Sequence, residues 1–408
     1  MTNFILKNTP FVDRILAATF SISTFILLDY LLPEVKFSEL IVLTAILQLT
    51  MPLSTWGAQS TLLGKLSAME ESEKAYCFFS CLAAISIMSV CVFFINLIVT
   101  TTVIGISPLS YTFFAVGIIN SWVVCDLYFY NQGLASRVLF IRLVIFLVFL
   151  LVRVILANNG KLDLLIISLP LEASVRNFFL FIQLRDKRWV KIQDITIFLR
   201  QNFFTTISNL FNGGIARSVI PLSSFFAFAD IRSLGYAQRC FEFGFLLLSA
   251  FTQSLCVRLS RIKEDSRFKI FVNAILRRFV IFLVLIYCLY AIGFGGMIMT
   301  LLGSKLDGSL LIAGFIYGAF SGIFGLITFL SSRFEVERER ATIGLLFAPI
   351  GYVLVLILTY THDLDLLFLL LPLSSMLALV LFCLFLSRFI RFRRAMVDIL
   401  EQSSVGAD

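Results

Sequence analysis

Long apolar runs separated by short polar stretches repeat along the whole chain. About 20 consecutive apolar residues are needed to cross the hydrocarbon core of a bilayer as an α-helix. The runs reach this length, so they predict about twelve membrane-spanning helices, with ends placed to within about 2 to 4 residues. The expected spans are residues 11–32, 37–64, 75–102, 108–132, 137–157, 161–184, 195–226, 231–257, 271–298, 307–330, 342–360 and 364–387.

The apolar runs are continuous rather than alternating, which favours helices over the strands of a membrane barrel. Backbone polar groups find no water in lipid, so a spanning segment must be a helix or part of a closed barrel. Barrel strands alternate apolar and polar residues, whereas segments such as Ile281 to Leu289 are apolar throughout. The sequence therefore predicts an all-α integral membrane protein. The run at 11–32 exceeds the apolar core of a signal peptide, so we expect it to be retained as the first helix.

Composition supports this class, because 59% of the residues are hydrophobic and 14% are charged. Soluble domains carry about 45 to 50% apolar and about 25% charged residues. The net charge of +8 requires no nucleic-acid partner, since anionic headgroups of membrane lipids attract cations beside the membrane. The eight cysteines are scattered through apolar runs without the spacing of metal ligands, so we expect small core residues and no metal site.

The distribution of Lys and Arg predicts the orientation, because cations in short loops are retained on the cytoplasmic side. With the amino terminus inside, 25 of the 33 cations fall in cytoplasmic segments and 5 fall on the opposite side. In this count Arg142 belongs to the cytoplasmic side and Arg153 to the outer side. We therefore expect a multi-pass protein of the bacterial inner membrane with both termini in the cytoplasm.

The longest polar stretch between the central spans runs from Arg185 to Arg200 and divides the helices into two sets of six. This division predicts an N-terminal lobe at 1–188 and a C-terminal lobe at 189–408, which ends in a short basic cytoplasmic tail. An even number of spans makes the two lobes parallel in topology. Parallel repeats are one arrangement of secondary transporters, which place the substrate in a central cavity between the repeats. The architecture therefore favours transport.

The arrangements of residues that enzymes use are mostly missing from the sequence. The only histidine, His362, lies in a predicted outer loop beside Asp363 and Asp365, which excludes a His-based triad or zinc centre within the membrane. No glycine-rich phosphate loop continues into Lys-Ser or Lys-Thr. We expect a protein that is not an enzyme and that needs no cofactor.

Ionisable residues inside the predicted spans are the strongest functional signal. Each costs about 2.5 to 3.5 kcal/mol at the centre of a helix unless it faces water or a partner. Guanidinium groups in a water-filled cavity suit a phosphate-bearing substrate, so we expect arginines to bind substrate and acids to couple ions. The candidate substrate-binding residues are Arg217, Arg239, Arg176 and Arg14, and the candidate ion-coupling residues are Asp126, Glu242 and Glu172.

Helical spacing offers a structural alternative for four of these residues. Glu172 and Arg176 are separated by four positions, and Arg239 and Glu242 by three, so each pair can form an ion pair on one face of its helix. Arg217 follows a polar stretch with two glycines, and such a face favours a hydrated cavity or a close helix neighbour over lipid.

Arg14 has a similar alternative. It lies beside Asp13 near the cytoplasmic end of the first span, where its side chain can reach the headgroups. Substrate contact and a position at the mouth of the cavity remain open for this residue.

The segment from Ala229 to Arg239 reads Ala-Asp-Ile-Arg-Ser-Leu-Gly-Tyr-Ala-Gln-Arg. It resembles the segment of polysaccharide flippases in which an acidic turn leads to Leu-Gly, Tyr and Ala-Gln-Arg, with a shorter spacing here. The Pro-Glu turn within Leu27 to Leu40 and the sequence Trp56-Gly57-Ala58 resemble the same family in the first lobe. This resemblance implies an O-antigen type flippase of the multidrug/oligosaccharidyl-lipid/polysaccharide exporter superfamily, and it identifies Arg239 as a substrate-binding residue.

We therefore expect a flippase that moves a polyprenyl-pyrophosphate-linked oligosaccharide, an O-antigen or capsule precursor, across the inner membrane by alternating access. Its expected partners are the lipid-linked oligosaccharide, membrane lipids and other glycan-assembly membrane proteins. The alternative is a cation-coupled drug or metabolite antiporter of the same superfamily, with Asp126 or Glu242 at the coupling site. An oligosaccharide polymerase is less favoured, because such enzymes have a large periplasmic loop that the predicted topology lacks.

Overall fold

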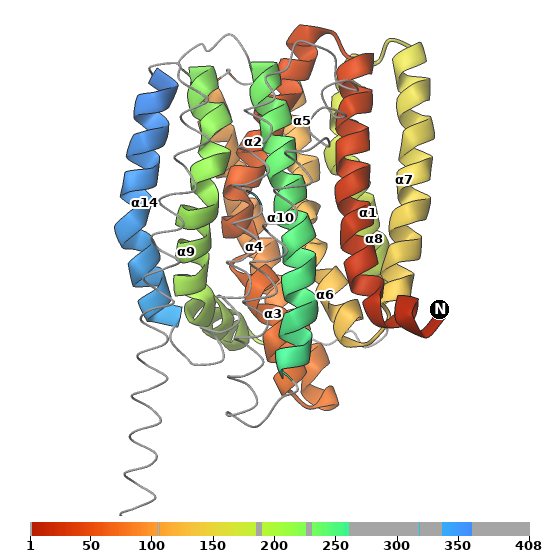
Figure 1. The fold of residues 1–408 in the computed structure, drawn as a ribbon, viewed down its shortest axis with the longest axis vertical. Coiled ribbons are helices and arrows are strands. Elements are labelled where there is room, and N and C mark those ends of the chain that lie inside the picture. Colours follow the sequence, from red (N-terminus) through yellow and green to blue (C-terminus); the bar gives the residue numbers. More distant parts are fainter. Residues whose placement is uncertain are drawn as a thin grey trace, which may run out of the picture.

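The computed structural model describes residues 2–103, 105, 107–184, 190–225, 231–260, 318 and 337–360 of the chain. The helices stand side by side with roughly parallel axes (Figure 1), and the described residues form helices and no strand. The spans predicted at 271–298, 307–330 (apart from residue 318) and 364–387, the basic tail and His362 lie outside the described residues.

Apolar runs of membrane-spanning length account for most of these helices. The helices are α1 (Thr2–Leu31), α2 (Glu34–Ser54), α3 (Ala58–Ala68), α4 (Glu71–Val103), α5 (Pro108–Gly117), the 3-10 helix η1 (Ile118–Val123), α6 (Val124–Asn131), α7 (Ala135–Asn158), α8 (Leu162–Ile182), α9 (Ile192–Phe225), α10 (Ile231–Ser260) and α14 (Glu337–Tyr360). Within the part of the chain that the structure describes, six segments are long and apolar enough to cross a membrane, namely Val12–Leu31, Glu34–Ser54, Glu73–Val103, Pro108–Asn131, Ala135–Asn158 and Leu162–Ile182. They correspond to the first six predicted spans, so the protein is a multi-pass membrane protein.

The helix predicted at 37–64 is interrupted between α2 and α3. Trp56 and Gly57 both have positive φ angles, 44° and 70°, which a bulky residue such as Trp rarely adopts. The break is held by a contact distant in sequence, because the Trp56 indole nitrogen donates a hydrogen bond to the Leu199 carbonyl at 2.7 Å. Gly57 packs closely on α9, since a Cβ at this position would lie 3.2 Å from the Thr205 side chain.

The helix predicted at 108–132 is also divided, because its middle winds as the 3-10 helix η1 between α5 and α6. Polar side chains of α8 bind backbone carbonyls there. Ser174 donates to the Val116 carbonyl at 2.7 Å, and Asn177 donates to the carbonyls of Ile119 and Asn120 at 3.1 and 3.2 Å. A segment of irregular helix within a membrane is stable where protein groups satisfy its backbone in this way.

Helices from the two predicted lobes pack together. α9 lies against α2, α4 and α14, and α10 lies against α1, as Figure 1 shows for α10 between α9 and α1. The contact is largely apolar, with Phe25 and Leu40 of the first half in one buried cluster with Leu234 and Ala237 of α10. The division at 188 and the orientation in the membrane stay predictions.

Two cations were assigned to the wrong environment by the loop count. The count assigned Arg142 and Arg153 to opposite sides of the membrane, although both fall within the span predicted at 137–157, and both lie inside α7 and are 8% and 0% exposed. Each is paired with a carboxylate. This pairing offsets the free-energy cost of placing a guanidinium inside the helix bundle. The 25-to-5 split therefore includes two residues that carry no information about topology.

Candidate functional site

A cavity of about 290 Å³ lies among the helices of the first half of the chain and reaches α10. Charged and amide side chains gather on its wall. They are Arg142, Glu172, Arg176, Arg239, Gln48 and Asn120. The apolar part of the wall includes Phe20, Leu47, Met51 and Phe113. A concave site with an apolar wall and a few convergent polar groups is typical of a small-molecule binding site.

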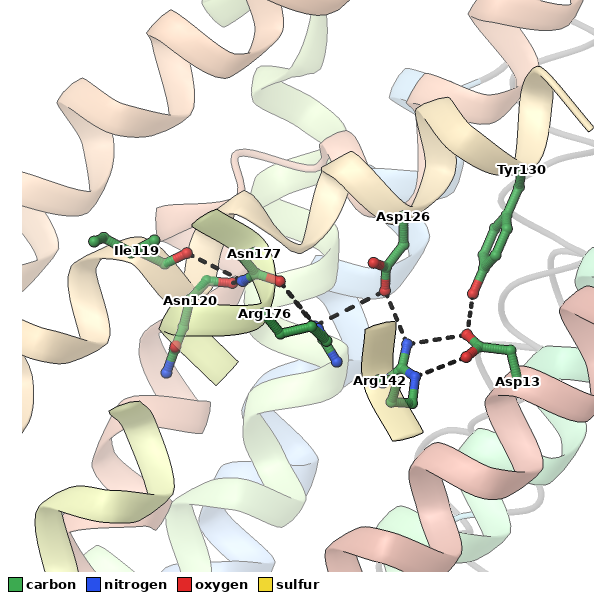
Figure 2. A network of polar contacts seen from close by, with 8 residues as sticks. All are labelled: Asp13, Ile119, Asn120, Asp126, Tyr130, Arg142, Arg176 and Asn177. Carbon is green, nitrogen blue, oxygen red and sulfur yellow. Dashed lines mark hydrogen bonds and ion pairs between the residues drawn. The ribbon is translucent and has the colours of Figure 1, made fainter. Parts of the chain in front are cut away.

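Asp13, Asp126 and Arg142 form the centre of a buried polar network (Figure 2). Arg142 of α7 binds both oxygens of Asp13, with its Nε 2.7 Å from Oδ1 and its Nη2 3.0 Å from Oδ2. The same Nη2 lies 3.0 Å from Oδ2 of Asp126 on α6. Tyr130 donates a further hydrogen bond to Asp13. Both carboxylates are fully buried, so the network links α1, α6 and α7 through a guanidinium that satisfies two acids at once.

Arg176 occupies the side of this network that faces the cavity. Its Nε and Nη2 donate to Oδ1 of Asn177 at 3.2 and 2.9 Å, while the Asn177 amide is anchored on η1. The Nη2 of Arg176 lies 3.9 Å from Oδ2 of Asp126. The carbonyls of η1 thus position Asn177, and Asn177 in turn holds the Arg176 side chain in place.

Glu172 and Arg153 form a second ion pair at the cavity wall. Arg153 Nη2 donates to Glu172 Oε2 at 2.6 Å, and Arg153 Nε donates to the Ser168 hydroxyl at 3.0 Å. The Thr24 hydroxyl accepts a third hydrogen bond at 3.3 Å, and the guanidinium carbon lies 5.8 Å from the ring centroid of Phe149. Glu172 keeps 22% of its side chain exposed, so it is the acid of the cavity wall that a solute can reach.

The first turns of α10 carry the segment that resembles flippases, and these turns bind helices of the first half. Arg232 and Tyr236 both donate to Oδ2 of Asp29 on α1, at 2.6 and 2.5 Å. Farther along, Gln238 donates to Gln48 of α2 at 2.6 Å. The motif residues are therefore contact residues between the two predicted lobes.

Arg239 completes the motif and lies on the cavity wall. It donates to Glu242 at 2.6 Å, and its guanidinium carbon lies 4.7 Å from the ring centroid of Phe25. The predicted pairing of Arg239 with Glu242 is confirmed. The predicted pairing of Glu172 with Arg176 is wrong, because Glu172 pairs with Arg153 and Arg176 lies beside Asp126.

The structure brings three of the seven candidate residues to the cavity wall and places the others behind it or elsewhere. Arg176, Arg239 and Glu172 line the cavity, and Asp126 is buried directly behind Arg176. The other three, Arg14, Arg217 and Glu242, are outside the described cavity lining. Arg14 lies instead over the Tyr130 ring, with 5.8 Å between its guanidinium carbon and the ring centroid. The roles of all seven in binding or coupling stay predictions.

Sequence reasoning missed Asp13, Arg142 and Arg153 as members of this site. Arg142 and Arg153 are eleven positions apart on α7, which is close to three full helical turns, so they share one face. The buried residues of α7 include Val138, Ile145 and Phe149 as well as both arginines. Helical periodicity within the predicted span 137–157 was therefore the signal that could have assigned both arginines to the interior of the bundle.

The described residues hold no group of three or more His, Cys, Asp or Glu side chains that could bind a metal ion. The charged groups at the cavity pair with one another instead. The site therefore offers ion pairs, guanidinium donors and one accessible carboxylate for chemistry with a solute.

Comparison with known proteins establishes the fold. No protein-family model matches the chain, and no curated protein sequence matches it. The eukaryotic MATE transporter AtDTX14 is similar, with a TM-score of 0.71, 10% identity and coverage of 94% of each chain. A mutant form of the Vibrio cholerae MATE transporter VcmN has a TM-score of 0.63 and 14% identity, with 94% of this chain and 95% of that chain covered.

MATE transporters have 12 transmembrane helices in two lobes, so the predicted fold class is confirmed. They belong to the exporter superfamily that the sequence resemblance indicated. At these identities the likeness establishes the shared fold.

Proposed function

We propose that this chain is a secondary transporter that moves a small organic molecule across the membrane by alternating access in exchange for a cation. The observation that carries the proposal is the charged cavity of about 290 Å³ inside a MATE-like helix bundle. Pockets for drug-sized ligands have volumes of about 300 to 1,000 Å³, so the cavity suits a small metabolite or drug. This is the antiporter alternative that the sequence left open.

Glu172 is the acid that we propose for cation coupling. It lines the cavity and is partly exposed, whereas Asp126 is fully buried and bound to Arg142. A proton that binds Glu172 would compete with Arg153, which donates to it at 2.6 Å. Glu172 then has two states, one bound to Arg153 and one bound to the cation. Alternating access requires a ligand that binds two conformations of the protein with different affinity.

Gradient-driven transport by the purified protein in proteoliposomes tests the proposal. We expect an imposed pH or sodium gradient to drive movement of small organic probes, and we expect Glu172→Gln to abolish the dependence on the gradient when transport is expressed per amount of reconstituted protein. Arg137→Gln is the matched control, because Arg137 is exposed on α7. Transport that is indifferent to every imposed gradient would refute the exchange mechanism.

A lipid-linked oligosaccharide flippase is the second candidate function. The flippase-like segment of α10 lies at the contact between the predicted lobes and contributes Arg239 to the cavity. A repeat unit of several sugars with a pyrophosphate is larger than a drug-sized ligand, so the cavity would have to widen to hold it. Restoration of surface glycan in a flippase-null bacterial strain would support this candidate, and the proposed inner-membrane location and cytoplasmic termini apply to both.

A further inference from the structure

Three arginines of the described residues line the cavity, and they differ in how closely a carboxylate neutralises them. Arg142 lies 3.0 Å from Asp126, and Arg239 lies 2.6 Å from Glu242. Arg176 has the loosest arrangement of the three, because 3.9 Å separates its Nη2 from the Asp126 carboxylate. The Coulomb attraction between two charges falls with distance. An external anion would therefore gain more binding free energy at Arg176 than at Arg142 or Arg239.

Arg176 is held in position although its ion pair is loose. Oδ1 of Asn177 accepts hydrogen bonds from its Nε and Nη2, which leaves the two N–H groups of Nη1 without an acceptor among the described residues. The side chain is 14% exposed and forms part of the cavity wall. A fixed guanidinium with donors to spare is a preorganised site for an oxyanion.

Asp126 is an incomplete partner for Arg176. Its Oδ2 already accepts a hydrogen bond from Arg142, and its buried Oδ1 makes no hydrogen bond within the part of the chain that the structure describes. The carboxylate is 0% exposed, so it cannot reach into the cavity. Asp126 therefore acts on Arg176 from behind, as a fixed counter-ion (Figure 2).

The other charges at the cavity are closely paired, so Arg176 is the charge that a solute meets. Glu172 is the acid of the wall, and its charge is engaged by Arg153 at 2.6 Å. An organic cation would meet Arg176, whose guanidinium is the least closely paired of the three on the wall. Desolvated charges of like sign repel strongly in a medium of low dielectric constant.

We propose that the cavity binds a small organic anion, a carboxylate or a phosphate ester, through the Nη1 donors of Arg176, and that Asp126 is the internal counter-ion with which this anion competes. The proposal rests on the transporter function proposed above and assigns the substrate class of the same cavity. Asn120 and Gln48 supply amide groups of the cavity wall for the rest of the molecule.

Binding to the full-length protein in detergent tests the site without any transport step. The probes are succinate, methyl phosphate and the organic cation tetraphenylphosphonium, and isothermal calorimetry measures the affinity. We expect one or both anions to bind the wild type and Arg176→Gln to weaken that binding about tenfold or more, as for the loss of a hydrogen bond to a charged group. Arg176→Lys should bind at an intermediate level, because it keeps the charge and loses the planar donors.

Asp126→Asn separates a binding role from a structural one. It removes the competing charge and should tighten anion binding severalfold, whereas general damage to the site would weaken it. Arg137→Gln, the exposed control, should bind as the wild type does. The proposal is overturned if neither anion binds, if Arg176→Gln binds as the wild type does, or if Asp126→Asn and Arg176→Gln weaken binding equally.

The same probes distinguish this inference from the transporter function itself. Tetraphenylphosphonium that binds and is transported, with no anion binding, would overturn the anion site and leave the exchanger intact. Anion binding that depends on Arg176, with no gradient-driven transport of any probe, would retain the anion site and overturn the exchanger.

Discussion

At the scale of single residues, Arg153 is the side chain whose burial demands the most explanation. It is among the largest fully buried side chains of the described residues, in a helix that the apolar sequence places in the membrane. Its donors reach Glu172, Ser168 and Thr24, and its face lies near Phe149. The cost of removing a guanidinium from water is offset only when its donors are satisfied in this way.

Removal of Arg153 should therefore destabilise the protein more than removal of an exposed cation of the same helix. Arg153→Met leaves Glu172 partly buried without its partner, and we expect a loss of about 3 kcal/mol in the free energy of unfolding. The double variant Arg153→Met with Glu172→Gln should recover much of this loss, because no uncompensated charge remains. Thermal unfolding in detergent measures both effects.

Arg137→Met on the exposed face of α7 is the control, and it should change stability by less than about 0.5 kcal/mol. Equal losses for Arg153→Met and Arg137→Met would show that the buried ion pair does not stabilise the fold.

The sequence revealed which residues were unusual but not which residues they contact. Arg176 and Glu172 were identified because a charge in an apolar run is costly wherever it points. Their partners were not identified, since Asp126 and Arg153 are brought to them by packing of α6 and α7 against α8. Helical spacing predicted the local pair of Arg239 with Glu242 correctly because both residues share one face of one helix.

At the scale of elements, α10 illustrates how one face of a helix joins the two predicted lobes. Arg232, Gly235, Tyr236 and Arg239 follow helical spacing of three and four positions, so they form one stripe. The stripe meets α1 through ion-pair and hydrogen-bond contacts and meets α2 where a Cβ at Gly235 would lie 2.6 Å from Cδ1 of Ile41. The helices approach closely there because glycine has no side chain.

Gly235→Ala should therefore push α10 away from α2 and weaken the contact between the lobes. Three atoms of the Ile41 side chain lie within 3.2 Å of the added Cβ, so a change of one rotamer does not make room. We expect a destabilisation of about 1 to 3 kcal/mol and reduced transport. Ile41→Ala in the same chain should restore part of both, because it vacates the space that the new methyl group needs.

A Gly235→Ala variant as stable and as active as the wild type would contradict close packing at this position. If Gly235→Ala lowers stability and transport and Ile41→Ala restores neither, the damage does not arise at the contact between Gly235 and Ile41.

The breaks in two predicted helices show where sequence reasoning stops at this scale. Apolar length gives the extent of a span, but it does not register a change of winding inside that span. The 3-10 turn at Ile118–Val123 and the break at Trp56 depend on hydrogen bonds from α8 and to α9. Both breaks lie next to contacts that the candidate site uses, which is where local rules are expected to fail.

At the scale of the whole molecule, the two predicted lobes touch near both ends of the bundle. At one end Asp29 of α1 binds Arg232 and Tyr236 of α10. At the other end Thr61 of α3 donates to Asn202 of α9 at 2.9 Å, and Tyr76 of α4 donates to Asp194. Alternating access requires contacts of this kind at the two ends of the bundle to open in turn.

Cross-links that prevent either contact from opening should therefore stop transport. One pair joins the end near the α1–α10 contact, Asp29→Cys with Arg232→Cys, and the other joins the opposite end, Thr61→Cys with Asn202→Cys. Both pairs are placed in a variant without the eight native cysteines. We expect oxidation to abolish probe transport in each case and a reductant to restore it.

A cross-link within one predicted lobe is the matched control. Lys36 of α2 and Asp163 of α8 form an ion pair at 3.0 Å, and both are partly exposed, so Lys36→Cys with Asp163→Cys can be oxidised without joining the lobes. Transport should survive this cross-link because the first six helices are expected to move as one body.

If the oxidised Asp29–Arg232 and Thr61–Asn202 pairs also transport at the wild-type rate, the lobes do not separate and the substrate must take another path. If only one of the two cross-links blocks transport, the contact joined by the other cross-link does not have to open, and alternating access with these two contacts as its gates is refuted.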